Sequence, residues 1–156
     1  VELIEGEILE MSPIGSRHAR CVDLLTALLV PAVQGRAIVR VQGPVRIPPR
    51  SEPQPDLALL RWRDDFYPEP VGPGDVLLII EVADSSVGED RRRKIPLYAA
   101  AGISEVWLVD LSAGRIDVHQ EPGPVGYDLL RTIGPGERVA PQALPDVSID
   151  AAVMLH

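Results

Sequence analysis

The sequence predicts an α+β domain, in which helices flank a mixed, mostly antiparallel sheet. The first observation is the run at residues 76–82, where six of seven residues are apolar, as in a strand buried on both faces. The second is an apolar stripe of helical period in residues 17–30. The third is a series of short apolar or alternating segments, separated by turns rich in proline and glycine. No repeat or inter-domain linker interrupts residues 1–156, so we expect a single domain.

Composition narrows the class of protein. With 156 residues, 46% of them hydrophobic, the chain can bury a core of its own. Its net charge of −8 argues against non-specific affinity for DNA, but it is compatible with a local basic patch. The single cysteine, Cys21, cannot form an internal disulfide, and no apolar run approaches the roughly 20 residues of a membrane helix. We therefore expect a cytoplasmic protein that does not enter a membrane.

The first helix is predicted from the period of its apolar residues. Ser16 is its expected N-cap, and Pro31 and Gly35 are expected to end it. The residues of the stripe would cover one face of the sheet. They are Cys21, Leu24, Leu25, Leu28 and Leu29.

Short apolar segments predict the strands of the sheet. They lie at residues 37–41, 44–47, 57–60, 76–82, 104–110, 115–119 and 127–133. A strand or hairpin arm at residues 3–11 precedes them, followed by a turn at residues 12–15. A second helix is expected after a turn at residues 84–88, with Gly102 as its C-cap.

Two acidic residues stand where neighbouring strands are expected to meet. Asp56 begins one strand, and Glu81 lies near the end of the next. If these strands pair antiparallel, the start of one lies beside the end of the other, and the two carboxylates meet at one edge of the sheet. Two carboxylates with open positions suit Mg²⁺ or Mn²⁺, which keep water ligands and take phosphate oxygens. The alternative is a pair of unrelated acids at strand ends that reach water.

The second helix brings a lysine to the same region. Asp90, Lys94 and Tyr98 are spaced i, i+4 and i+8, which places them on one stripe of the helix. A lysine near a metal site can hold the attacking water and offset charge on a phosphate. The alternative is a surface ion pair between Asp90 and Lys94, worth about 0.3 kcal/mol.

The other charged residues allow two interpretations. Arg91, Arg92 and Arg93 form the only dense basic run, which predicts either contacts with nucleic-acid phosphates or a solvated helix face. His18, in the first turn of the first helix, faces either the site or water, and we expect water. The sequence has no glycine-rich phosphate loop, no zinc-type spacing of cysteine and histidine, and no Gly-x-Ser-x-Gly motif.

Three blocks of sequence, taken together, resemble a known family. The blocks are residues 3–8 with Ser12, Pro13 and His18; residues 54–58; and residues 81–82, 90–98 and 102–110. Their order and spacing are similar to those of the Uma-type endonucleases of bacteria. These proteins belong to the restriction-endonuclease-like superfamily, which carries the motif Pro-Asp…(Asp/Glu)-x-Lys. The resemblance extends over nearly the whole chain.

The resemblance implies a restriction-endonuclease-like α/β/α core with Mg²⁺, or Mn²⁺, held by Asp56 and Glu81. It implies metal-dependent hydrolysis of phosphodiester bonds, with DNA as the expected substrate. In the usual superfamily pattern the lysine stands two residues after the glutamate, where this chain has Ala83. Lys94, displaced onto the next helix, would take that role.

The resemblance also implies an accessory set around these three residues. Its members are Glu7, His18, Asp90 and Tyr98. Glu7 would supply a further acid, Asp90 would orient Lys94, and Tyr98 would pack beside the lysine. The chain departs from the family at residues 84–87, Asp-Ser-Ser-Val, where the family usually has Ser-Pro-Ser-Thr.

Two other functions stay open from the sequence. One is a non-catalytic module that keeps the nuclease fold and binds nucleic acid or protein, which the negative charge and Ala83 favour. The other is a metal-dependent hydrolase of a substrate other than DNA. A homodimer is also possible, because the strand at residues 115–119 is expected to be an edge available for pairing.

Overall fold

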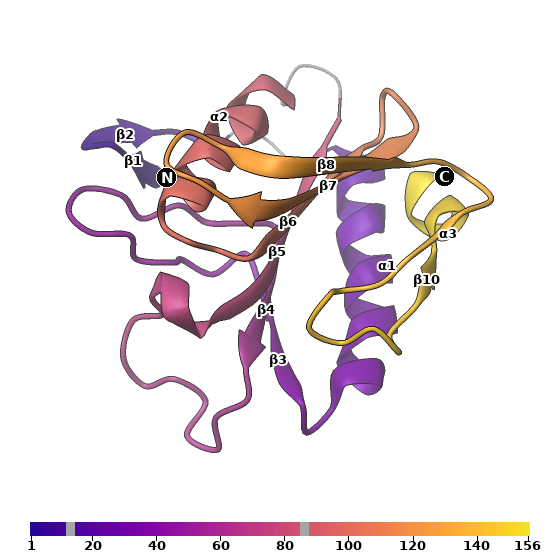
Figure 1. The fold of residues 1–156 in the computed structure, drawn as a ribbon, viewed down its shortest axis with the longest axis horizontal. Helices are drawn as coiled ribbons and strands as arrows, with labels where there is room; N and C mark the ends of the chain where they lie inside the picture. The colour runs from indigo at the N-terminus through magenta and orange to yellow at the C-terminus, as the bar shows by residue number, and fades with distance from the viewer. Residues whose placement is uncertain (12–14, 85–87) are drawn as a thin grey trace.

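A six-stranded mixed sheet lies at the centre of the structure (Figure 1). The computed structural model describes residues 1–11, 15–84 and 88–156, together with their side chains except those of residues 88–90. In spatial order the strands are β3 (Ala37–Val41), β4 (Leu57–Arg61), β5 (Val76–Ala83), β6 (Glu105–Asp110), β7 (Arg115–Pro122) and β8 (Tyr127–Ile133). Neighbouring strands are antiparallel except for β5 and β6, which are parallel. The predicted α+β class and the mostly antiparallel sheet are confirmed.

Helices cover both faces of this sheet (Figure 1). They are α1 (Ser16–Val33) on one face and α2 (Gly88–Ala100) on the other. Side chains alternate along β5, so Leu78 and Ile80 pack in the core beneath α1, whereas Ile79 packs in the core beneath α2. The central strand is therefore apolar on both faces, as its sequence predicts. Within the described residues, no helix has the length and hydropathy that crossing a membrane requires.

Short elements complete the layers. A hairpin of β1 (Glu2–Ile4) and β2 (Glu7–Leu9) turns at Gly6, whose φ of +85° favours glycine. Leu3 and Glu52 exchange backbone hydrogen bonds, which tie β1 to the proline-rich loop before β4. The other elements are η1 (Pro73–Asp75), β9 (Arg138–Val139), β10 (Ile149–Asp150) and α3 (Ala151–Leu155).

The first helix is longer than its sequence predicts. Ser16 is its first helical residue rather than its N-cap, which is Gly15. The expectation that Pro31 ends the helix is wrong, because the helix continues to Val33. Proline has a φ compatible with a helix and removes only one backbone donor. Val33 is buried in the core, and this burial favours the extra turn.

Two strand predictions also need correction. The strand at residues 115–119 is not an edge, because β7 pairs with β6 on one side and with β8 on the other. The edges of the six-stranded sheet are β3 and β8. The predicted strand at residues 44–47 does not form. Ile47 instead makes an isolated β-bridge with Ser51 across the tight turn of the proline-rich loop. The predicted turns at residues 12–15 and 84–88 include residues 12–14 and 85–87, which lie outside the described residues.

The packing of α1 makes a prediction with a control on the same helix. Leu25 is fully buried, whereas Leu28 is 40% exposed. Leu25→Ala is expected to lower the free energy of unfolding by about 3 kcal/mol, because it leaves a cavity in the core. Leu28→Ala is expected to lower it by less than about 1 kcal/mol. Urea unfolding of both variants measures the difference, and equal losses would mean that α1 does not pack as described.

Candidate active site

The pairing of β4 with β5 brings two buried carboxylates together. Leu57 is opposite Ile80 in the antiparallel register, so Asp56 and Glu81 are neighbours at this edge of the pair. Both side chains are almost fully buried. A single guanidinium reaches both, because Arg91 Nε lies 2.9 Å from Asp56 Oδ2 and 3.8 Å from Glu81 Oε2. The structure thus brings together the two acids that the strand order predicts to meet.

Asp56 is surrounded by donors. Its Oδ2 accepts the backbone N–H of Val82 at 2.8 Å, and Arg91 donates to both carboxylate oxygens, at 2.9 and 3.2 Å. His18 Nε2 lies 3.0 Å from Asp56 Oδ1. Burial alone would raise the pKa of Asp56, but the hydrogen bonds from His18 and Arg91 lower it to about 2. Asp56 is therefore ionised at neutral pH.

Glu81 is only partly satisfied. Lys94 Nζ lies 2.9 Å from its Oε1, and the hydroxyl of Tyr98 donates to the same oxygen at 2.9 Å. Its Oε2 is buried and accepts no hydrogen bond from the described residues. Burial raises the pKa of Glu81 to about 7, and the charge of Lys94 offsets this only in part. A buried carboxylate oxygen without a donor is a position that a cation would stabilise.

A third carboxylate, Glu2, holds the other side of the lysine. Lys94 Nζ donates to Glu2 Oε1 at 2.7 Å, and the backbone N–H of Gln54 donates to the same oxygen at 2.8 Å. Burial would lower the pKa of Lys94, but Glu81 and Glu2 raise it above its usual value. Lys94 is therefore a buried ammonium held between two carboxylates.

The structure does not place Glu7 in this cluster. Glu7 is exposed on β2, and Glu2 on the paired strand takes the position of the additional acid. Sequence reasoning missed Glu2, although one signal was present. Glu2 and Ile4 are two residues apart on a strand and share a face, and Ile4 is buried. Glu2 is therefore directed inward.

His18 is also placed differently from its prediction. We expected it to face water, but it is only 2% exposed. It lies one turn before Cys21 and Val22 on the buried face of α1, which turns its ring towards Asp56. Its Nε2 is 3.0 Å from Arg91 Nη2 as well, so this nitrogen either donates to Asp56 or accepts from Arg91, depending on the tautomer.

The basic run on α2 divides into three environments. Arg91 is turned inward to Asp56 with a side chain only 11% exposed, Arg92 pairs with Asp110, and Arg93 is exposed. Of the three arginines predicted to contact nucleic acid, Arg93 is the one that is exposed and makes no ion pair with the described residues. The stripe of Lys94 and Tyr98 is directed to Glu81, as the helical spacing predicts, but the side chain of Asp90 lies outside the described residues.

The carboxylate oxygens of Asp56 and Glu81 are of the kind that bind a divalent cation. Mg²⁺ commonly takes only one or two carboxylates from a protein and fills its other positions with water and substrate phosphate. Asp56 and Glu81 supply such a pair, and Glu81 Oε2 has no donor. Within residues 1–11, 15–84 and 88–156, no group of three or more acids, histidines and cysteines is arranged to bind a metal. A metal held here would therefore rely on these two carboxylates.

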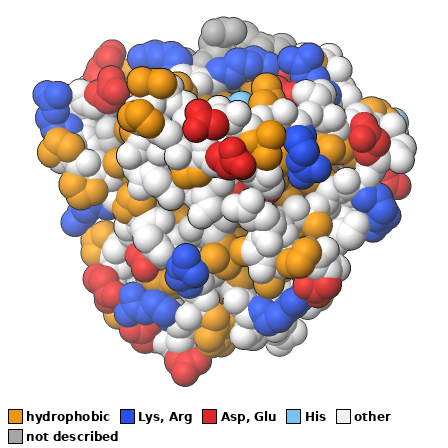
Figure 2. All heavy atoms as spheres, in the orientation of Figure 1, with side chains coloured by type: hydrophobic (Ala, Val, Ile, Leu, Met, Phe, Trp, Pro, Cys, Tyr) orange, Lys and Arg blue, Asp and Glu red, His pale blue; other side chains and the backbone are white. Residues whose placement is uncertain are grey.

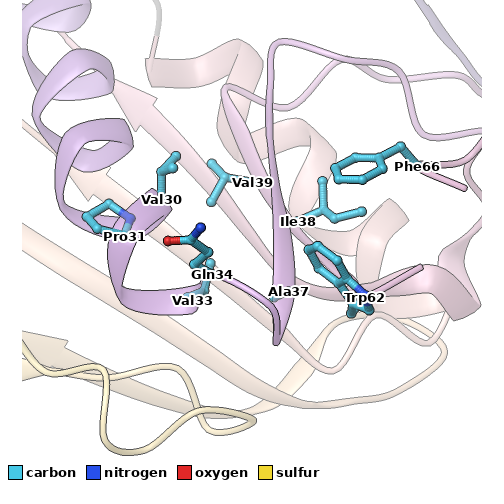
Figure 3. Close-up of a pocket in the computed structure, with 9 residues that line it drawn as sticks. All are labelled: Val30, Pro31, Val33, Gln34, Ala37, Ile38, Val39, Trp62 and Phe66. Carbon is cyan, nitrogen blue, oxygen red and sulfur yellow. The ribbon is translucent and has the colours of Figure 1, made fainter. Parts of the chain in front are cut away.

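An apolar groove lies elsewhere, between the end of α1 and the edge strand β3 (Figure 3). Val30 of α1 lines one side, and Trp62 and Phe66, which make an edge-to-face contact, line the other. None of the nine residues that line it has a titratable side chain. The groove therefore offers no acid or base, unlike the buried cluster around Asp56 and Glu81.

The lowered pKa of Asp56 predicts a dependence of stability on pH in the absence of metal. The folded-state pKa is about 2 rather than 3.8, so ionised Asp56 stabilises the fold above about pH 4. This contribution is lost as the pH falls through about 2. Asp56→Asn is expected to cost about 2 kcal/mol or more at pH 7 and roughly half that at pH 3. Urea unfolding in EDTA measures both values. Asp23→Asn, at an exposed acid of α1, is the control and should show no such trend.

Comparison with known proteins identifies the family and supports the fold. Residues 1–152 match the family model described as "Uma2: Putative restriction endonuclease". A crystal structure titled "a putative nuclease belonging to DUF820", from Anabaena variabilis, superposes with a TM-score of 0.77. The alignment covers 99% of this chain and 89% of that chain, and at 13% identity it shows a shared fold. No curated protein matches. Because the family model spans almost the whole chain, the protein belongs to the Uma2 family.

Proposed function

We propose that this protein is a nuclease that uses Mg²⁺ or Mn²⁺ to hydrolyse phosphodiester bonds, with DNA as its substrate, and that residues 1–156 act as one restriction-endonuclease-like domain. The observation that carries the proposal is the buried pair Asp56 and Glu81 with Lys94 at hydrogen-bond distance from Glu81. Membership of the Uma2 family, described as "Putative restriction endonuclease", supports it. The structural neighbour, described as "a putative nuclease", supports the same class of reaction.

Asp56 and Glu81 are the residues that would hold the metal. When bound, the ion would polarise a phosphoryl oxygen and lower the pKa of a coordinated water. His18 fixes the orientation of the Asp56 carboxylate, and the Tyr98 hydroxyl fixes that of Glu81. These contacts hold both carboxylates in place before a substrate binds, which reduces the cost of organising the site.

Lys94 is the proposed cationic group of the reaction. Its raised pKa keeps it protonated, so it acts as a donor and a fixed charge rather than as a base. Glu2 and Glu81 hold its ammonium from two sides, which leaves one of its three N–H groups for a water or a phosphate oxygen. In this arrangement Glu2 is a positioning residue, because it acts through Lys94.

Exposure indicates where a phosphate would approach. Glu2 and Arg91 are the most accessible side chains of the site, at 11% each, whereas Lys94 is at 5%. The approach therefore lies between the β1–β2 hairpin and the first turns of α2. Figure 2 shows basic side chains gathered at the top of the view, where α2 lies in Figure 1, and a mixture of both charges elsewhere. Such a local basic area is compatible with a phosphate backbone despite the net charge of −8.

One observation favours a second candidate function. Arg91 already neutralises Asp56 and lies within 4 Å of Glu81, so the charge of Asp56 is compensated without a metal. If the Arg91 guanidinium stays between Asp56 and Glu81 and blocks metal binding, the protein would be a non-catalytic module that keeps the nuclease fold and binds nucleic acid or protein. Cleavage assays separate the two functions, because the module would bind without cutting.

The proposed catalytic residues predict a cleavage phenotype. Asp56→Ala, Glu81→Ala and Lys94→Ala are each expected to lower metal-dependent cleavage of plasmid DNA by about 100-fold or more, because each removes a metal ligand or the fixed cation. The measurement is the initial rate with Mg²⁺ and with Mn²⁺, against an EDTA blank. If all three variants cut at the wild-type rate, the proposal is wrong. If the protein cleaves bis(p-nitrophenyl) phosphate but leaves plasmid DNA uncut, the substrate is not DNA.

The placement of Glu2 gives a test with a matched control on the same hairpin. Glu2→Gln is expected to lower kcat by about 10-fold with little change in KM, because Lys94 loses one of its two carboxylate partners. Glu7→Gln, at the exposed acid of the paired strand, should leave both constants unchanged. A loss of activity in the Glu7 variant, with none in the Glu2 variant, would restore the assignment made from sequence.

A further inference from the structure

We propose that Arg91 is a resident counter-ion, which occupies the cation position between Asp56 and Glu81 and must be displaced when a divalent metal binds. The inference rests on the proposed metal site, which it deepens by naming the competitor. Arg91 is the residue that contacts Asp56 through two nitrogens and also approaches Glu81.

The geometry sets the two cations in competition. The guanidinium occupies both oxygens of Asp56 and lies 3.8 Å from Glu81 Oε2, the oxygen that has no hydrogen-bond donor among the described residues. A metal held by both carboxylates would need these oxygens at about 2.1 Å. A guanidinium and a divalent ion about 4 Å apart repel strongly in a buried site. The two cations therefore exclude each other.

The charges explain why an arginine is needed in the metal-free protein. Three largely buried carboxylates, Asp56, Glu81 and Glu2, face one another in this site. Lys94 contacts Glu81 Oε1 and Glu2, so it leaves Asp56 without a cation. His18 contributes a charge only when it is protonated. Without Arg91, the carboxylate of Asp56 would be buried with little compensation, which is costly.

Arg91 is also the cation of the site that can leave. Its side chain is 11% exposed, and its long stem allows the guanidinium to reach water without moving the helix. Lys94 is more deeply buried and is held by two carboxylates. Displacement of Arg91 therefore leaves Lys94 in position and gives the metal access to the oxygens of Asp56.

Competition of this kind lowers the apparent affinity for metal. If the arginine-paired state holds about nine-tenths of the metal-free molecules, the apparent affinity falls about 10-fold. Arg91→Ala is thus expected to bind Mn²⁺ about 10-fold more tightly than the wild type in calorimetric titration. Arg91→Lys, which keeps the charge but loses the bidentate contact, should show a smaller gain. Arg131→Ala, at an exposed arginine of β8, is the control for loss of charge and should match the wild type.

A second readout does not involve metal affinity. In EDTA, Arg91→Ala should lower Tm by several degrees relative to Arg131→Ala, because it leaves buried carboxylates unpaired. Excess Mn²⁺ should restore most of that loss, since the ion replaces the missing charge. A Tm that is unchanged in EDTA would overturn the role of Arg91 as a counter-ion.

The outcomes separate this inference from the proposed function. Equal Mn²⁺ affinity in the wild type and in Arg91→Ala, with binding abolished by Asp56→Ala, would overturn the inference and leave the metal site intact. Binding by Arg91→Ala but not by the wild type would support the inference and overturn metal-dependent hydrolysis. No binding by either folded protein would overturn both.

Discussion

The need to neutralise buried carboxylates governs the arrangement of this site. Asp56, directly before β4, and Glu81, on β5, are almost fully buried beside each other, where an unpaired charge is costly. Their partners come from elements far apart in the sequence: His18 from α1, and Arg91 and Lys94 from α2. Each of these elements also packs in a hydrophobic core. The same contacts therefore help to fix the fold and build the site, and a change in charge at one residue affects both.

Local rules account for the part of the site that the sequence predicts. Asp56 and Glu81 meet because two strands adjacent in sequence pair antiparallel, and this requires only the positions of the strand ends. Lys94 and Tyr98 point to Glu81 together because they are four residues apart on a helix that follows the glutamate strand. In the first case the geometry follows from the pairing of two strands, and in the second it follows from the period of one helix.

The residues that sequence reasoning misplaces depend on contacts between distant elements. Glu2 reaches Lys94 because the β1–β2 hairpin is tied to the proline-rich loop through Leu3 and Glu52. His18 is buried because of the rotation of α1 about its axis, which is set by the packing of Cys21, Leu25 and Leu29 in the core. Similarly, β7 is not an edge because β8 returns to pair with it. The spacing of neighbouring residues can indicate which face of its own element carries Glu2 or His18, but not which distant residue that face meets.

The displaced lysine has a structural consequence for α2. Where Ala83 occupies the usual lysine position, the strand supplies no cation, so both Arg91 and Lys94 come from one helix. Tyr98 and Ile95 of that helix are buried in the core beneath it, which anchors the helix through apolar contacts as well as charge. Under the proposal that a metal displaces Arg91, the exchangeable cation lies near the start of the helix, and Lys94 stays held one turn further along. One helix would then stabilise the metal-free site and still admit a metal.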